Sequence, residues 1–182
     1  MISHLNNWIY QNDRENEVRF ILGRKGSKPL ICFGINPSTA EPQNLDNTLK
    51  SVERISKYNG FDSWIMFNIY PQRATNPKNL HKELDTLLHK KNLEIISNLL
   101  SNYSQNTIWA AWGTLIEKKD YLYNCLNDIY QATLNNNCKW ITFGEKSKKG
   151  HPHHPLYLKT TSVFESFAID NYLLKLLEYG RN

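Results

Sequence analysis

The sequence lacks a long hydrophobic run: no apolar stretch in its 182 residues approaches the roughly 20 that a membrane-spanning helix needs. The first residues, 1–17, are polar and include acidic side chains. They therefore lack the basic start and apolar middle that characterise a signal peptide. We expect a soluble, cytoplasmic protein that has no membrane partner.

Cysteine is also scarce, and its pattern is informative. Cys32, Cys125 and Cys138 are odd in number, widely spaced and set in apolar or helical surroundings. Disulfide frameworks and zinc sites instead use clustered or evenly paired cysteines. We therefore expect three reduced core thiols, and the sequence predicts no redox role, no metal site and no cofactor.

Internal repeats, low-complexity tracts and linkers are missing too, so the sequence predicts one domain that spans residues 1–182. The net charge of +5 leans mildly towards polyanionic partners. Paired lysines on predicted helices are typical of solvated faces. Lys146, Lys148 and Lys149 differ, because they precede a histidine-rich loop and could guide an anion there. No obligate protein partner is predicted.

Short apolar runs alternate with longer segments of helical spacing. The predicted strands are 18–22, 30–35, 64–69, 107–112 and 139–143. The predicted helices are one that Asp46 caps and Gly60 ends, 80–103 with a break near Lys90, 115–134, and a C-terminal helix that starts at the capping-box pair Ser162 and Glu165 and stops at Gly180.

This alternation predicts right-handed βαβ units in an α/β protein. We expect a three-layer α/β/α sandwich with a central, mainly four-stranded parallel sheet. Residues 18–35 add an N-terminal β-hairpin, in which 23–29 form the turn. Ligands bind outside the carboxyl ends of such strands, so those ends are the places to search for a site.

The first buried strand ends in Gly34, Ile35, Asn36, Pro37 and Ser38. Glycine permits close approach to the backbone, and proline forces a rigid departure that aims Asn36 outward. A carboxamide lacks useful basicity, so Asn36 would hold a water or a ligand by hydrogen bonds. The alternative is that Asn36 only stabilises a turn, since Asn-Pro is a common turn dipeptide.

The second strand ends with Asn68 inside an otherwise apolar run, followed by Arg73. An Asn amide offers a donor and an acceptor side by side, which suits the edge of a nucleobase. The alternative is a core Asn that bonds to neighbouring backbone. Arg73 either contacts phosphate or pairs with a surface carboxylate.

The third strand ends in Trp112 and Gly113, which predict a scaffold with a tight turn. After the fourth strand, one loop holds His151, His153 and His154, three of the six histidines. Histidine can donate to an anionic leaving group or to phosphate. A metal site is the rival interpretation, but adjacent histidines do not easily face one centre, and no HExxH or CxxC motif accompanies them.

These motifs resemble a bacterial and phage family known as domain of unknown function 1643. The resemblance lies in Asn36-Pro37-Ser38-Thr39-Ala40, Asn68 with Arg73-Ala74-Thr75, Ala111-Trp112-Gly113, and Gly150 with His154-Pro155-Leu156-Tyr157-Leu158. The motifs span most of the chain. The family name implies no activity.

A more distant resemblance is to the uracil-DNA glycosylase superfamily. Gly34-Ile35-Asn36-Pro37 resembles the water-positioning motif of its mismatch-specific branch, although Ser38 stands where that branch has glycine. The resemblance implies that Asn68 reads a base edge and that His154, or His151 if one residue is inserted, starts the last motif. It also implies that Leu156 wedges into a duplex when a base is flipped out.

The resulting hypothesis is hydrolysis of an N-glycosidic bond to a nucleobase in DNA or in a nucleotide. Asn36 would place water, and His154 would stabilise the departing base. Gly34, Pro37, Ser38, Asn68, Arg73, Lys148 and Leu156 are the predicted substrate-binding residues. The alternatives are a module that binds a modified base without cutting it, and a hydrolase or transferase of small nucleotides.

Overall fold

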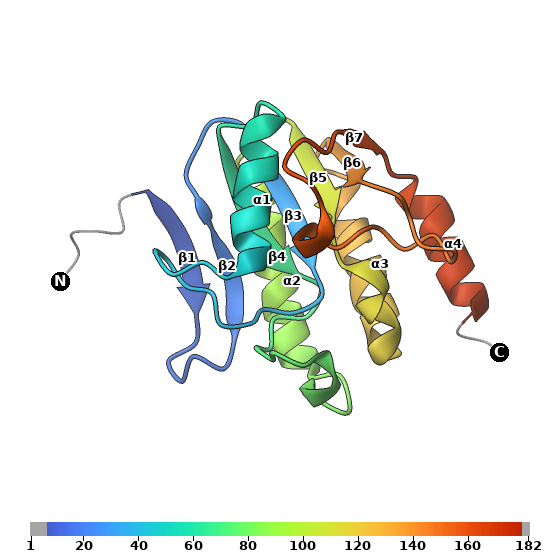
Figure 1. The fold of residues 1–182 in the computed structure, drawn as a ribbon. Coiled ribbons are helices and arrows are strands. Elements are labelled where there is room, and N and C mark those ends of the chain that lie inside the picture. The colour runs from blue at the N-terminus through green and yellow to red at the C-terminus, as the bar shows by residue number, and fades with distance from the viewer. Residues whose placement is uncertain (1–6, 180–182) are drawn as a thin grey trace.

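In the computed structural model, which describes residues 7–179, seven strands form one sheet in the order β1-β2-β4-β3-β5-β6-β7 (Figure 1). The central strands β4, β3, β5 and β6 are parallel neighbours, whereas β1, β2 and β7 pair antiparallel at the two sides. The strands are β1 (Trp8–Asn12), β2 (Arg19–Arg24), β3 (Pro29–Gly34), β4 (Ser63–Asn68), β5 (Asn106–Ala110), β6 (Cys138–Phe143) and β7 (Phe164–Ser166). The sheet is thus mixed and wider than the four strands predicted.

Helices cover both faces of this sheet. One apolar cluster joins the sheet to α1 alone among the α-helices, and the other joins it to α2, α3 and α4. Figure 1 shows α1 in front of the central strands. The α-helices are α1 (Asn47–Tyr58), α2 (Thr86–Leu100), α3 (Tyr121–Thr133) and α4 (Ile169–Tyr179), and three short 3₁₀ helices are η1 (Pro77–Asn79), η2 (Gly113–Lys118) and η3 (Pro155–Tyr157). The chain is therefore an α/β protein in three layers.

Helix α1 confirms its predicted capping signals. The Asp46 carboxylate accepts a hydrogen bond from the Leu49 backbone N–H at 2.9 Å, which satisfies one free donor of the first turn. The helix ends at Tyr58, and Gly60 follows with a φ of +77°, which a residue with a side chain rarely adopts. These local signals place the start of α1 beside the carboxyl end of β3.

The predicted N-terminal hairpin is wrong in its partners. Strand β2 pairs with β1 and β4, and β3 lies on the other side of β4. Gly23 was predicted to be in the turn, but it lies inside β2, where an added Cβ would meet the Trp64 carbonyl oxygen at 2.6 Å. The glycine therefore serves a close approach of two strands. The Asp62 carboxylate accepts the backbone N–H groups of Ser27 and Lys28, which directs the following chain to β3.

Two long predicted helices are shorter in the structure. Helix α2 begins after its cap Asp85 and runs through Lys90 without a break. Residues 115–134 do not form one helix: 115–118 belong to the 3₁₀ helix η2, and α3 begins only at Tyr121. The apolar spacing in 80–103 also predicts that Leu87 lies on the inner side of this helix, but Leu87 is 79% exposed.

The predicted start of the C-terminal helix is also wrong. Residues Phe164–Ser166 form β7, which pairs antiparallel with β6, and α4 starts only at Ile169. The edge of β6 has unpaired backbone N–H and C=O groups, and residues 164–166 pair with them. This pairing outweighs the helix-start signal of Ser162 and Glu165. Cys32 and Cys125 are buried and Cys138 is half-buried, and all three are free thiols as predicted.

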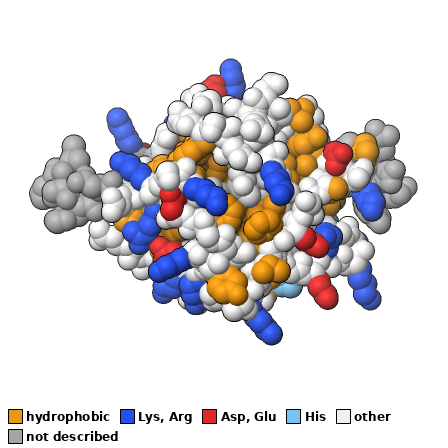
Figure 2. Space-filling view, turned by 90° about the horizontal axis from the view of Figure 1, so that it is seen from above, with side chains coloured by type: hydrophobic (Ala, Val, Ile, Leu, Met, Phe, Trp, Pro, Cys, Tyr) orange, Lys and Arg blue, Asp and Glu red, His pale blue; other side chains and the backbone are white. Residues whose placement is uncertain are grey.

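Surface cations are scattered rather than aligned. Figure 2, which looks onto the molecule from above Figure 1, shows Lys and Arg side chains separated by apolar and acidic ones. Exposed cations that pair with carboxylates include those of Arg24–Glu53, Lys146–Glu165 and Lys149–Glu117. Within residues 7–179 no helix has both the length and the apolar character needed to cross a membrane.

Replacing Ile96 by Ala should destabilise the fold by about 2–5 kcal/mol, because this fully buried side chain of α2 leaves a cavity. Leu87→Ala is the matched control on the same helix, and it should change stability by less than about 0.5 kcal/mol. Urea unfolding followed by circular dichroism measures both. Similar losses in the two variants would contradict the assignment of the inner face of α2.

Candidate functional site

A cavity of about 360 Å³ opens at the carboxyl ends of β3 and β4. Its walls come from several separate parts of the chain: the end of β3 and the loop after it, the start of α1, the end of β4 and the segment after it, and η3 with the residue before it. Arg19 of β2 and Leu115 of η2 complete the lining. The lining residues are Arg19, Gly34, Ile35, Asn36, Ser38, Asp46, Asn47, Thr48, Leu49, Met66, Asn68, Ala74, Thr75, Pro77, Leu115, His154 and Leu156.

Most of the predicted site residues share this pocket. Those that line it are Gly34, Asn36, Ser38, Asn68, His154 and Leu156. Pro37, Arg73 and Lys148 do not. Pro37 is buried, and Lys148 is exposed on the loop after β6.

Asn68 has an uncommon environment for a buried amide. Its side chain is at the end of β4 and is 1% exposed, yet neither Nδ2 nor Oδ1 has a hydrogen-bond partner among the described residues. Its backbone carbonyl accepts a hydrogen bond from Asn92 Nδ2 at 3.0 Å. An unpaired buried amide costs free energy, so a donor and an acceptor stand ready at the pocket for a ligand.

Gly34 keeps the space beside Asn68 open. A Cβ at this position would lie 2.6 Å from Met66 Cε and 3.1 Å from Asn68 Oδ1. Any side chain here would therefore press on the two residues that form this wall of the pocket. The sequence prediction of a close approach at Gly34 has this physical basis.

Asn36 joins the loops that follow β3 and β4. Its Nδ2 donates to the Ala74 carbonyl at 2.6 Å and to the Pro37 carbonyl at 3.0 Å. The Ala74 N–H returns a hydrogen bond to Pro37 O at 2.9 Å. With its nitrogen so engaged, the amide has its carbonyl oxygen left to offer the pocket.

His154 is held in one orientation by the chain that follows it. Its Nδ1 accepts a hydrogen bond from the Leu156 backbone N–H at 3.3 Å and so caps η3. Burial lowers the pKa of this imidazole, Asp46 partly opposes the shift, and His153 adds to it. A neutral ring that accepts at Nδ1 carries its proton on Nε2, which makes Nε2 a donor.

Gly113 brings the His154 loop close to the end of β5. Its φ is +64°, and an added Cβ would meet His154 Cβ at 3.2 Å. The glycine thus permits both the turn into η2 and the packing of His154 against it. The prediction that this strand end is a scaffold agrees with this contact.

His151, the alternative motif histidine, is 2% exposed and does not line the pocket. Trp112 Nε1 donates to the Tyr172 hydroxyl at 3.0 Å, that hydroxyl lies 2.7 Å from His151 Nδ1, and His151 Nε2 lies 2.7 Å from Glu117. Hydrogen bonds from Lys149 first, and then from His151, lower the pKa of Glu117. This network anchors the loop from which His154 projects.

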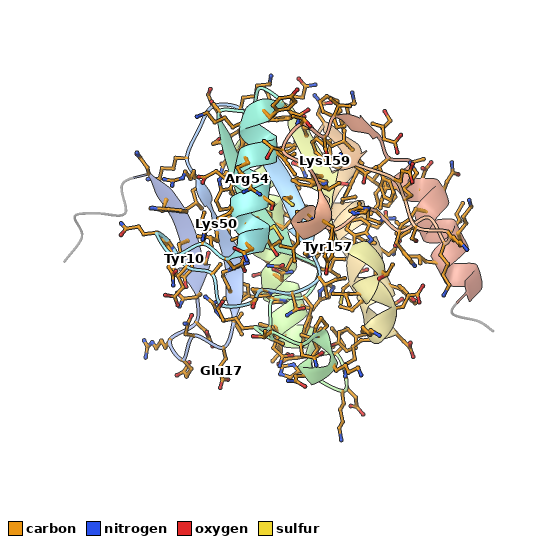
Figure 3. All side chains as sticks on the ribbon, in the orientation of Figure 1. Tyr10, Glu17, Lys50, Arg54, Tyr157 and Lys159 are labelled. Carbon is orange, nitrogen blue, oxygen red and sulfur yellow. The ribbon has the colours of Figure 1, made fainter. Side chains whose placement is uncertain are left out.

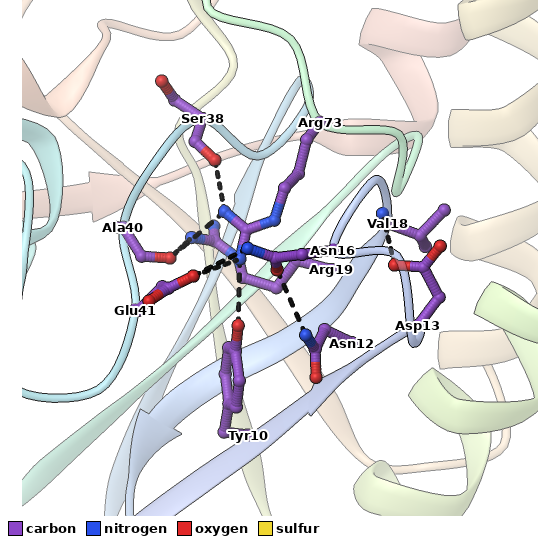
Figure 4. Close-up of polar contacts among 10 residues, drawn as sticks. All are labelled: Tyr10, Asn12, Asp13, Asn16, Val18, Arg19, Ser38, Ala40, Glu41 and Arg73. Carbon is purple, nitrogen blue, oxygen red and sulfur yellow. Dashed lines mark hydrogen bonds and ion pairs between the residues drawn. The ribbon is translucent and has the colours of Figure 1, made fainter.

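Arg73 lies behind the loop that follows β3. Its guanidinium donates to the carbonyls of Ser38 and Ala40 and to the Tyr10 hydroxyl, and Glu41 is 4.0 Å away (Figure 4). The side chain therefore spans the pocket wall from outside. Its observed contacts are with neutral backbone and hydroxyl oxygens, plus this one half-exposed carboxylate.

Two charged residues that line the pocket were missed as site candidates. Arg19 reaches the pocket from β2, and Asp46 lines it while also capping α1. Asp46 was interpreted only as a helix cap, and its sequence context gave no reason to expect a second role in a pocket. Arg19 gave no signal, since nothing local shows that β2 lies beside β4.

Exposed apolar and basic side chains lie on η3 and α1, the two elements that contribute Leu156 and Thr48 to the pocket. Leu156 is 41% exposed and Tyr157, the next residue of η3, is 75% exposed. Figure 3 shows Tyr157 and Lys159 next to α1, which presents Lys50 and Arg54. Among residues 7–179 no cluster of three His, Cys, Asp or Glu side chains is arranged to hold a metal ion.

Comparison with known proteins gives one result. A family model described as "Protein of unknown function (DUF1643)" matches residues 19–156. Searches of curated proteins and of solved structures returned no match. The matched segment contains every residue that lines the pocket, from Arg19 to Leu156.

The lowered pKa of His154 predicts a stability that depends on pH. Between the lowered pKa and the ordinary value of 6.5, the His154 imidazole is protonated in the unfolded chain but neutral in the folded chain. Stability should therefore fall as the pH drops from that value to the lowered pKa, and His154→Gln should remove this component. Proton NMR titration of the imidazole measures the pKa directly, with His153→Gln as a control for assignment. A His154 pKa at or above 6.5 would contradict the prediction.

Proposed function

We propose that this chain, which belongs to the DUF1643 family, binds a nucleobase in the pocket and hydrolyses the N-glycosidic bond that joins the base to its sugar. The observation that carries the proposal is the buried Asn68 amide, whose donor and acceptor are both unpartnered at the pocket. The resemblance of four strand-end motifs to uracil-DNA glycosylases supports the same reaction.

Asn68 is suited to read the edge of a base. Its amide presents N–H and C=O groups side by side, the pattern that pairs with an adjacent acceptor and donor on a base. A pocket of about 360 Å³ also lies within the usual range for small ligands. Binding would satisfy two groups that are unsatisfied in the free protein, so recognition is selective for ligands with a matching edge.

Asn36 would position the water. Its nitrogen is committed to Ala74 and Pro37, so its oxygen accepts a hydrogen bond from the water and fixes the direction of attack. A carboxamide does not remove a proton at neutral pH. The reaction therefore needs a separate proton acceptor.

Asp46 would be that acceptor. It contributes a carboxylate to the pocket wall, and only its Oδ1 is engaged in capping, by the Leu49 N–H. The water oxygen bonds to the sugar carbon, its proton passes to Asp46, and the carbon–nitrogen bond breaks with its electron pair left on the base. The first motif, residues 34–38, contains no Asp or Glu, so the start of α1 would supply the carboxylate.

His154 would stabilise the departing base. Nδ1 accepts the hydrogen bond from the Leu156 N–H, so the proton of the neutral ring is on Nε2, which can donate it to the base. A hydrogen bond to the base strengthens as negative charge develops, so it lowers the barrier more than it tightens substrate binding. The exposed Leu156 and Tyr157 at the rim fit a strand from which a base has been flipped out.

Base release tests the proposal. Single- and double-stranded oligonucleotides carrying uracil, hypoxanthine or mismatched thymine, and the corresponding nucleotides, are incubated with the protein and scored for abasic sites or free base. We expect release for at least one base, and a loss of about 100-fold or more in Asn36→Ala and in His154→Ala.

Both variants must keep their circular dichroism spectrum and unfolding midpoint for the comparison to count. Release that is unchanged in both variants would refute the assigned roles. Binding of a base-containing ligand without any release would reduce the proposal to a recognition module. Binding that falls steeply with salt would then indicate a nucleic-acid strand rather than a small nucleotide.

The charge of Asp46 can be separated from its role as a cap. Asn caps a helix as well as Asp does, so Asp46→Asn should keep the fold and reduce base release by about 100-fold or more. Asp85→Asn, at the cap of α2, is the matched control, because Asp85 accepts the Leu88 N–H at the same 2.9 Å but does not line the pocket. Equal base release in the two variants would remove Asp46 from the mechanism.

A further inference from the structure

Arg19 is a buried cation that the proposed chemistry does not use. Its side chain lines the pocket and is 2% exposed. Nη1 donates to the Ala40 carbonyl at 3.0 Å, and Nε has no hydrogen-bond partner among the described residues. A guanidinium has five N–H donors, so one backbone carbonyl leaves most of its hydrogen-bonding capacity unused.

The neighbours of Arg19 do not neutralise it by direct contact. Arg73 donates to the same Ala40 carbonyl at 3.3 Å, so two guanidinium groups lie side by side (Figure 4). Glu41 is 4.0 Å from Arg73 and also accepts a hydrogen bond from Asn16. Within the described part of the chain, no carboxylate lies within 4.0 Å of Arg19.

Burial lowers the pKa of Arg19 to about 10, and the positive charge of Arg73 adds to this, while Asp46 and Tyr10 oppose it. The side chain therefore remains a cation at neutral pH. Burying a cation without an ion pair or a full set of hydrogen bonds is unfavourable. An anion that enters the pocket would give Arg19 both an ion pair and further hydrogen bonds.

The start of α1 adds a second favourable element to the pocket wall. Asn47 and Thr48, the first two residues of the 12-residue helix α1, line the same pocket. Backbone N–H groups at a helix start attract anions. Asp46 is the opposing charge, and its Oδ1 already accepts the Leu49 N–H. The pocket thus holds one guanidinium, one helix start and one carboxylate.

We propose that Arg19 forms an anion subsite in this pocket, which takes the phosphate group of a nucleotide whose base is held at Asn68. The inference rests on the proposed function, because it assigns the base to Asn68. The edge formed by Nε and Nη2 is distinct from the Nη1 bound to Ala40. Two parallel N–H groups on one edge match two oxygens of a phosphate.

A phosphate can reach this subsite from two sources: the monoester of a free nucleotide or the diester of a strand. Calorimetric titration of the whole chain distinguishes them with three sets of probes. These are nucleosides of uracil, thymine, cytosine, adenine, guanine and hypoxanthine, their 5′-monophosphates, and short single-stranded oligonucleotides that contain the same bases. Inorganic phosphate is added as a competitor.

For any base that binds, we expect the monophosphate or the oligonucleotide to bind about tenfold or more tightly than the nucleoside, as befits hydrogen bonds to a charged group. Arg19→Gln should abolish this advantage, whereas Arg24→Gln, on the same strand but outside the pocket, should keep it. Asp46→Asn should enlarge the advantage, because it removes the opposing charge.

The affinities of the wild-type protein for the three sets of probes test the subsite by themselves. The test therefore remains valid if the Arg19→Gln variant misfolds. Equal affinities for nucleoside, monophosphate and oligonucleotide would overturn the subsite and leave the base pocket standing. Binding of none of the probes would overturn the proposed function together with the subsite. An advantage that persists in a folded Arg19→Gln variant would assign the phosphate to other groups.

Discussion

The pocket depends on the hydrogen bonds that join the loop after β3 to the loop after β4. Asn36 Nδ2 and Pro37 O hold both the carbonyl and the N–H of Ala74, while Arg73 reaches from the second loop to the carbonyls of the first. These bonds satisfy backbone groups that the strands no longer pair. These hydrogen bonds limit how far the two loops separate. The pocket lies between the loops, next to Gly34 and Asn68 at the ends of β3 and β4.

Local signals predicted the parts of this arrangement that arise within one segment. The cap at Asp46, the buried run at β3 and the strand-end positions of Asn36 and Asn68 follow from patterns only a few residues long. Because parallel strands present their carboxyl ends together, these residues were expected to meet, and they line one pocket. The reaction itself does not follow from such patterns.

The errors concern features that depend on partners distant in sequence. Gly23 has the local character of a turn, and only the approach of Trp64 explains its place inside a strand. Residues Phe164–Ser166 pair with an edge of β6 that no short window reveals. Arg19 enters the site for the same reason, since its position depends on β2 lying beside β4. Sequence patterns found the central strands and β2, but not β1, β7 or the pairing of β2 with β4.

The two histidines of the last loop illustrate how one segment separates support from chemistry. His151 is fixed at both nitrogens, by Tyr172 and Glu117, so it has no donor or acceptor left for a ligand. Among residues 7–179, His154 forms a hydrogen bond at Nδ1 only, which leaves Nε2 to meet a ligand at the pocket. The two hydrogen bonds of His151 hold the loop in place. His154 can therefore keep its position with only one of its two nitrogens bonded to the protein. The same reasoning connects Arg73, which engages the loop carbonyls, with Arg19, which retains unused donors beside them.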